Sequence, residues 1–190
     1  MTTMTNTTTA PTTLPLAAGT WTLDPYHSEV GFTVRHLGIS KVRGAFRQLD
    51  AELVVGPTLA ESSVTATIQV ASVDTGNADR DAHVLAPDLL DVSIRPTLAF
   101  RSTSITDEGD GEYRVDGDLT IGDVTRPVTL QAELGGVESF PMDGSTHAGF
   151  EATAEIKRSD FGITFGPLDA ALGNVIKIAI DLQLVAPAAE

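Results

Sequence analysis

The sequence predicts an all-β fold, either an antiparallel barrel or a sandwich, with one short helix. From Trp21 onward, apolar and polar residues alternate, which is typical of strands with one buried and one solvated face. Continuous apolar runs and long helical crossovers, which parallel sheets show, do not occur in the pattern. Eight or nine such one-sided strands in one domain must close on themselves or pair as two sheets.

Six strands follow from clear alternation, at 30–34, 64–70, 113–121, 128–134, 150–156 and 176–184. Shorter candidates lie at 41–47, 50–55 and 97–103. The stretch DEGDGE at 107–112 is typical of a hairpin loop between two strands. Helical signals are confined to NADRDAHVLAPDLLDV, where Asn77 is a good N-cap, and to a turn near 169–172.

The length of 190 residues fits a single domain. Residues 1–18 are rich in Thr and predict a flexible tail, residues 19–186 the barrel domain, and residues 187–190 a C-terminal tail. The N-terminus lacks the basic and apolar regions of a secretory signal, so we expect a cytoplasmic protein.

Composition narrows the function classes. The chain has no cysteine, which excludes disulfides, thiolate metal sites and cysteine nucleophiles. Its formal net charge of −14 disfavours nucleic acids and anionic lipid headgroups as partners. No stretch reaches the ~20 apolar residues of a membrane helix, so we expect no stable membrane insertion.

Small residues in the apolar rows favour a cavity inside the predicted barrel. An eight-stranded barrel is just wide enough to be filled by side chains or to hold one small ligand. Only ten aromatic residues are available to fill it. The alternative is that the small residues ease tight packing at barrel corners. They are Gly44, Ala66, Gly117, Ala132, Ala152 and Ala154.

Two of the four histidines, His27 and His36, are nine residues apart and would face opposite sides of one strand, so they do not form a pair. His27 is better explained as fixing the turn near Asp24. His36 extends the apolar row of Phe32 and Val34 and should point inward near a strand end. Arg158 extends another apolar row in the same way. This position predicts either polar contacts with a ligand at the cavity mouth or internal hydrogen bonds with Asp160 or Asp24.

Asp79 and His83 have the i, i+4 spacing of a metal pair or an acid–base pair on a helix. A capped, salt-bridged helical turn explains them equally well, and no third ligand is visible nearby. Motifs for a serine nucleophile, a phosphate loop or a zinc protease are missing. We therefore expect that the protein has no metal site and is not an enzyme. One alternative is a metal-dependent or acid–base enzyme that acts on a quinone or lipid. Another alternative is a stress-response interaction module.

The segment GTWTLDPYHSEVGFTVRHLGISKVRGAF resembles the opening of the YceI-like family of lipocalin-like, polyisoprenoid-binding barrel proteins. Four later segments resemble the same family in order: NADRDAHVLAPDLLDV, RPTLAF, GDLTIGDVTRPVTL and IKRSDFGI. In the first segment the resemblance rests on Trp21, Asp24, His27, Ser28, Phe32, Val34, His36, Gly44 and Phe46. Two departures bear on the mouth, since Leu89-Leu90 replaces an aromatic pair and Arg95 replaces a Tyr before proline.

The resemblance implies an extended eight-stranded antiparallel lipocalin-like barrel, with a short helix covering one end and a tunnel for a long apolar chain. It implies a polyprenyl or similar lipid as the bound partner, no other cofactor, and a homodimer formed through a surface other than strand edges. We expect the polar mouth contacts to come from His36 and Arg158. The expected apolar lining is Phe32, Val34, Ile68, Phe100, Leu119, Leu130, Phe150, Ile156 and Phe161.

Overall fold

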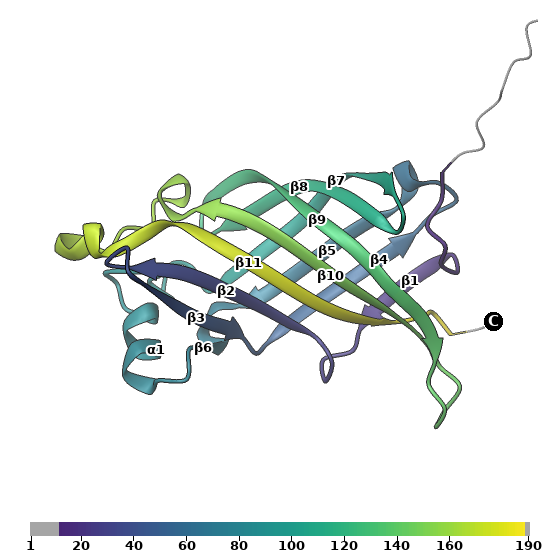
Figure 1. The fold of residues 1–190 in the computed structure, drawn as a ribbon, viewed down its shortest axis with the longest axis horizontal. Helices are drawn as coiled ribbons and strands as arrows, with labels where there is room; N and C mark the ends of the chain where they lie inside the picture. The colour runs from purple at the N-terminus through teal and green to yellow at the C-terminus, as the bar shows by residue number, and fades with distance from the viewer. Residues whose placement is uncertain (1–11, 189–190) are drawn as a thin grey trace, which may run out of the picture.

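The computed structural model describes residues 12–188, and Figure 1 shows an elongated barrel of tilted strands. Its one α-helix is α1 (Ala78–Leu85). The 3-10 turns are η1 (Leu59–Glu61), η2 (Val70–Ser72), η3 (Arg158–Phe161) and η4 (Gly166–Ala171). The strands are β1 (Gly19–Leu23), β2 (Glu29–His36), β3 (Ser40–Phe46), β4 (Leu49–Val55), β5 (Ser63–Gln69), β6 (Val73–Asp74), β7 (Thr97–Gly109), β8 (Glu112–Ile121), β9 (Val124–Ser139), β10 (Thr146–Lys157) and β11 (Leu172–Val185).

The strand segments form one closed antiparallel barrel of eight strands, which confirms the barrel and excludes the sandwich. β1 and β2 are two parts of one interrupted strand, because both pair with β11. β3 and β4 are likewise two parts of the next strand, since β3 pairs with β2 and β4 with β1. β5 and β6 form the third, and β7 to β11 follow as single strands in chain order.

β6 gives the third strand only a short pairing with β3. β6 is only two residues long and pairs with β3 at Ala45 and Phe46, so the rest of the β3 edge has no strand partner within residues 12–188. After β6 the chain continues into α1, which lies beside β3 and β6 at one end of the barrel (Figure 1). The predicted helix and its cap are confirmed, since the Asn77 side chain accepts a hydrogen bond from the Arg80 N–H (2.9 Å). No helix within the described residues is long and apolar enough to cross a bilayer.

The opposite end of the barrel is closed by the N-terminal segment. Leu14 is buried in the same apolar cluster as Trp21, whose indole N–H donates to the Ala17 carbonyl (2.8 Å). The Leu59 N–H donates to the Thr12 carbonyl (3.0 Å). Residues 12–18, which the sequence places in the tail, thus contact the barrel through Leu14 and through Leu16, which packs against the same cluster. The remaining tail residues, 1–11 and 189–190, lie outside the described residues.

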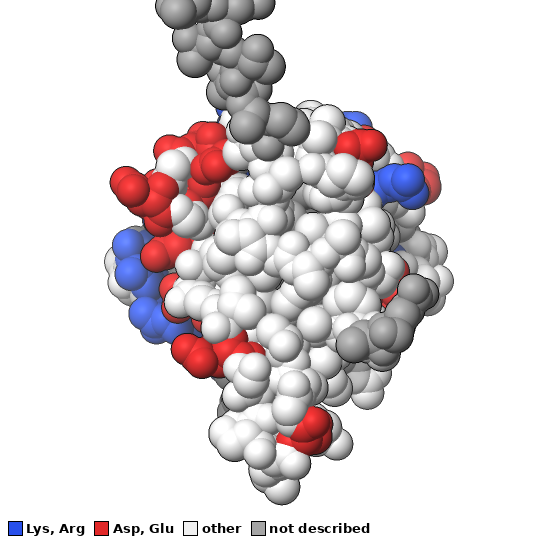
Figure 2. All heavy atoms as spheres, turned by 90° about the vertical axis from the view of Figure 1, so that its right-hand side faces the viewer, with Lys and Arg blue, Asp and Glu red and all other residues white. Residues whose placement is uncertain are grey.

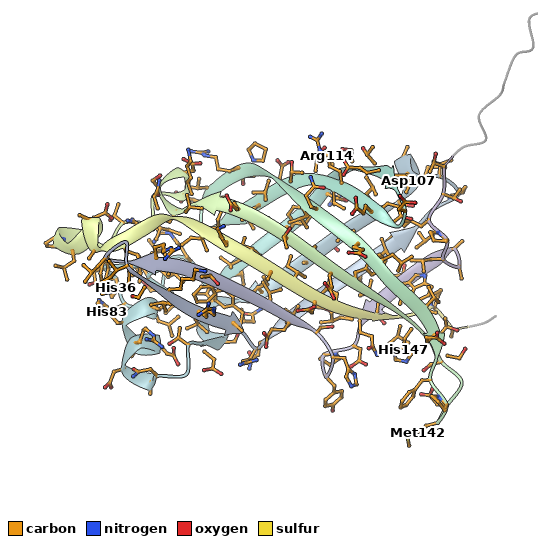
Figure 3. All side chains as sticks on the ribbon, in the orientation of Figure 1. His36, His83, Asp107, Arg114, Met142 and His147 are labelled. Atoms are coloured by element: carbon orange, nitrogen blue, oxygen red, sulfur yellow. The ribbon has the colours of Figure 1, made fainter. Side chains whose placement is uncertain are left out.

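Uncharged residues occupy the middle of this closed end, with acidic and some basic side chains around them (Figure 2). Met142 lies on the β9–β10 hairpin that projects beside the closed end (Figure 3). Both described chain ends lie here too, away from α1 (Figure 1). The α1 end is consequently the end at which the barrel interior is reached.

Candidate apolar cavity

The barrel interior holds a cavity of about 370 Å³ that reaches the α1 end. A second cavity of about 80 Å³ follows it toward the closed end. The two share wall residues Ala51, Val64 and Leu130, so they succeed each other along the barrel axis. Their walls are almost entirely apolar side chains. Together they suit a long, thin, apolar molecule.

Most of the predicted lining residues lie on the larger cavity. They are Phe32, Val34, Ile68, Phe100, Leu119, Leu130 and Ile156. Phe150 lines the smaller cavity instead. Phe161 lines neither, because it belongs to η3 rather than to the strand and is buried against Ile121 and Ile163. The alternation along β10 stops at Lys157, and the 3-10 turn that follows places Phe161 away from the cavity wall on which we expected it.

Two glycines on the wall make room for aromatic rings. A Cβ atom on Gly44 would lie 2.5 Å from the Cζ atom of Phe32, its cross-strand partner. A Cβ atom on Gly117 would lie 2.4 Å from the Cζ atom of Phe100. Each ring therefore lies against the wall in the space that a side chain would have taken. These two glycines therefore contribute both to the cavity and to tight packing, because they let the rings of Phe32 and Phe100 lie flat against the wall.

His36 lies at the mouth of the cavity, at the end of β2. Its backbone carbonyl accepts hydrogen bonds from the Ile39 N–H (3.2 Å) and the Ser40 hydroxyl (3.4 Å), which fixes the turn and leaves the ring to the cavity. In Figure 3, His36 and His83 lie at the α1 end, whereas His147 lies near the closed end. His36 is thus one of the few polar side chains at a mostly apolar opening.

Arg158 also borders the cavity, but protein acceptors occupy all five of its N–H groups. Its Nε donates to the Gly173 carbonyl (3.1 Å) and Nη1 to the Ile163 carbonyl (3.0 Å) and Asp169 Oδ1 (2.6 Å). Nη2 donates to the carbonyls of Asp169 (3.0 Å) and Leu172 (2.8 Å). The prediction that Arg158 contacts a ligand headgroup does not fit this geometry. The internal alternative does, with Asp169 as the partner instead of Asp160 or Asp24.

The Arg158 network shapes the electrostatics of the mouth. The guanidinium hydrogen bond, together with that of the Phe165 N–H, holds the pKa of Asp169 below its ordinary value of 3.8. Because Arg158 is only 5% exposed, the cation is buried and its acceptors must stay in place. This side chain therefore ties η3, η4 and the start of β11 into one rigid part of the rim.

The Asp79–His83 pair does not form. His83 instead contacts Asp88, with Nε2 2.9 Å from Oδ2, and this hydrogen bond lowers the pKa of Asp88. The His83 ring also stacks at a tilt against Phe165 (5.1 Å between centroids). Within residues 12–188, no three His, Asp or Glu side chains gather as a metal site would require. His83 is a wall residue of the mouth.

The sequence pattern did not predict several wall residues at the mouth. These residues follow the helix α1, in a segment where apolar and polar residues do not alternate as in a strand. Leu89 and Leu90 line the cavity and pack against the cluster of Ile121 and Ile163. Arg95 donates to the Leu90 carbonyl (3.0 Å) and the Gly162 carbonyl (3.3 Å), which ties this segment to η3. The departures from the family pattern at Leu89, Leu90 and Arg95 thus fall on a segment that lines the cavity mouth and packs against η3.

His27 lies far from the cavity, at the turn between β1 and β2. Its Nδ1 is 2.8 Å from Asp24 Oδ2, and the Tyr26 N–H donates to Asp24 Oδ1 (2.9 Å). Burial by itself would raise the pKa of Asp24, but the hydrogen bonds from His27 and Tyr26 outweigh it and lower the pKa. His27 and Asp24 hold this turn together.

Comparison with known proteins agrees with this architecture. The model of the YceI-like domain matches residues 21–184. Protein YceI of Escherichia coli O157:H7 is 39% identical over 155 residues, which is 80% of both chains. The crystal structure of Burkholderia cenocepacia BcnA superposes with a TM-score of 0.74 at 25% identity, over 87% of this chain and 99% of BcnA.

A more distant structure shares the fold. A polyisoprenoid binding domain from Saccharophagus degradans, implicated in plant cell wall breakdown, superposes with a TM-score of 0.65 at 13% identity. The match covers 90% of this chain and all of that one.

Proposed function

Because the chain belongs to the YceI-like domain family, we propose that its barrel binds one long apolar lipid, of the polyprenyl class or similar. The observation that carries the proposal is the apolar cavity of about 370 Å³, which falls within the ~300–1,000 Å³ of small-molecule sites. The similar fold of a polyisoprenoid binding domain supports the ligand class. Storage or transport of that lipid is the role we propose for binding.

The ligand would enter tail first. The deep end of the cavity and its smaller extension are apolar, while His36, His83 and Arg80 stand at the opening. Burying each methylene group is worth about 0.8 kcal/mol. Affinity should therefore rise with each added isoprene unit until the cavity is full, and a polar head should stay at the His36 end.

The mouth favours binding over catalysis. Arg158, the buried cation on the wall, has all its donors bonded to protein, and His83 is paired with Asp88. These groups hold the rim in shape and are not aimed at a bound molecule. We therefore propose a binding protein rather than an enzyme.

The test is ligand uptake by protein stripped with organic solvent and refolded. We expect one polyprenyl chain per protein by native mass spectrometry, with an affinity that increases with chain length. Ala66→Phe, which fills the cavity wall, should lower the affinity at least tenfold. Its matched control is Thr67→Phe, on the exposed face of the same strand. A protein that takes up no lipid of any length, or equal effects of both variants, would refute the proposal.

A further inference from the structure

Five basic side chains gather on the outer face of the barrel near the mouth. They come from four neighbouring strands, β3, β2, β11 and β10 in spatial order, and all are exposed. The chain has twelve Lys and Arg residues in all, so this cluster takes a large share of its positive charge. We call it the basic cluster, and it consists of Arg35, Lys41, Arg43, Lys157 and Lys177.

The strand register brings these cations close together. Arg35 is the direct cross-strand partner of Lys41, and Thr33 stands between Arg43 on one side and Lys177 on the other. Like charges directly opposite each other destabilise a sheet. Within the cluster, Lys177 forms an ion pair with Glu155 (3.2 Å), and both of these side chains are largely exposed. The arrangement costs stability unless an anion covers it.

The same face becomes acidic farther from the mouth. Five carboxylates stand in direct register on adjacent strands: Glu112, Glu133, Glu151, Asp181 and Glu29. Thr33 is four positions from Glu29 along β2, which corresponds to ~13 Å. This distance exceeds the Debye length of ~8 Å at physiological ionic strength. On this face of the barrel, a surface in contact with the mouth would thus meet the basic cluster before the acidic row.

Apolar side chains project beside the basic cluster. Leu37 and Ile39, in the turn between β2 and β3, are 58% and 81% exposed, and Leu168 in η4 is 60% exposed. The Leu37 N–H donates to the Ala171 carbonyl (2.7 Å), which joins the turn to η4. We call these three side chains the apolar rim, and they lie on the side of the opening formed by the β2–β3 turn and η4, next to His36.

We propose that the mouth end docks on the surface of an anionic lipid bilayer. The basic cluster would contact lipid phosphates while the apolar rim enters the headgroup layer, as amphipathic surface segments do. Charge complementarity selects an anionic partner, and the exposed Leu and Ile side chains at the mouth of an apolar cavity select a bilayer over a nucleic acid. The expectation from net charge, that anionic headgroups are disfavoured, overlooks this segregation of charge.

Docking goes beyond lipid binding in the cavity, and it can be tested separately. Full-length protein is mixed with phosphatidylglycerol–phosphatidylcholine vesicles that carry no polyprenyl lipid, and the bound fraction is measured by flotation. We expect binding to these vesicles, weak binding to pure phosphatidylcholine, and a decrease as salt is raised. Each cation near an anionic surface contributes about fivefold, so R35Q/K41Q should weaken binding about 30-fold.

Matched variants identify the surface responsible. R101Q/R114Q removes the same charge from exposed positions outside the cluster and should leave binding within twofold. I39S/L168S should weaken binding with no change of charge. Folding of each variant is checked by its unfolding midpoint. The proposal fails if wild type floats with neither vesicle, if both charge variants lose binding equally, or if soluble double-stranded DNA is bound as tightly as the vesicles.

Discussion

Arg158 and Asp169 meet at the cavity mouth, with Arg158 Nη1 2.6 Å from Asp169 Oδ1. The two residues belong to η3 and η4, separate turns with a short loop between them. The arginine is buried, whereas the carboxylate is 52% exposed. The link therefore joins an internal cation to a solvated anion, and it fixes the loop that carries Phe165 and Leu168 over the rim.

Removal of the Arg158 guanidinium should destabilise the whole barrel. Arg158→Met leaves four carbonyls and one carboxylate without their donors, and unsatisfied buried acceptors cost about 1–3 kcal/mol each, less where water replaces the donor. We expect the free energy of unfolding to fall by about 3 kcal/mol in urea denaturation. The control is Arg101→Met at an exposed position, which should change it by less than about 0.5 kcal/mol. Equal effects would show that Arg158 is an ordinary surface residue.

The Arg158–Asp169 link should also be sensitive to acid. The pKa of Asp169 is lower in the folded protein than its ordinary value of 3.8, so the folded state favours the carboxylate. The resulting stabilisation is present above pH 3.8 and is lost as the pH falls through the folded pKa. The difference in unfolding free energy between wild type and Asp169→Asn, measured from pH 6 to pH 2.5, should therefore shrink at the acid end. A difference that is constant across this range would contradict the assignment.

The fit of Phe32 over Gly44 should set the width of the cavity. A methyl group in Gly44→Ala would meet Phe32 Cζ (2.5 Å) and Thr75 Cγ2 (2.9 Å), both side-chain ends that can move. The ring would turn into the cavity, at a cost of about 1–2 kcal/mol in stability. We expect a folded protein whose affinity for long lipids drops while short ones still bind. Gly149→Ala, with no neighbouring atom within 4 Å of its added Cβ, should bind all lengths normally.

The N-terminal segment should contribute measurably to stability. Leu14 is 6% exposed and lines the smaller cavity, so Leu14→Ala enlarges a void at the closed end. Substitutions of this kind cost about 2–5 kcal/mol, and thermal unfolding should show a clear loss. The exposed neighbour in Thr13→Ala should have almost no effect. If Leu14→Ala were equally silent, the segment would not be docked in solution.

The sequence predicted the barrel well because strand alternation reports which side of a sheet is buried. Phe32, Phe100 and Ile156 all face the cavity, as their rows required. The prediction failed where the periodicity ended. Phe161 follows the last strand residue of β10, and a 3-10 turn redirects its side chain into the core.

Contacts between residues distant in sequence could not be predicted in the same way. The partner of Arg158 is eleven residues away, across a loop whose path depends on the packing of η4. Leu14 was missed for a related reason, since Leu14 and Leu16 on either side of a proline are too short a stretch to predict an element. The burial of Leu14 depends on the end of a barrel formed by residues that follow it.

The short pairing of β6 with β3 has a consequence for how such a barrel can vary. Where backbone hydrogen bonds complete the ring, the circumference is fixed by the number and tilt of the strands. Beside β3 the ring is completed by side chains of α1 and of the segment containing Leu89 and Leu90. Exchanges among those side chains can resize the entrance while every strand keeps its register. Specificity for the width of a ligand can therefore change in this gap without any cost to the rest of the wall.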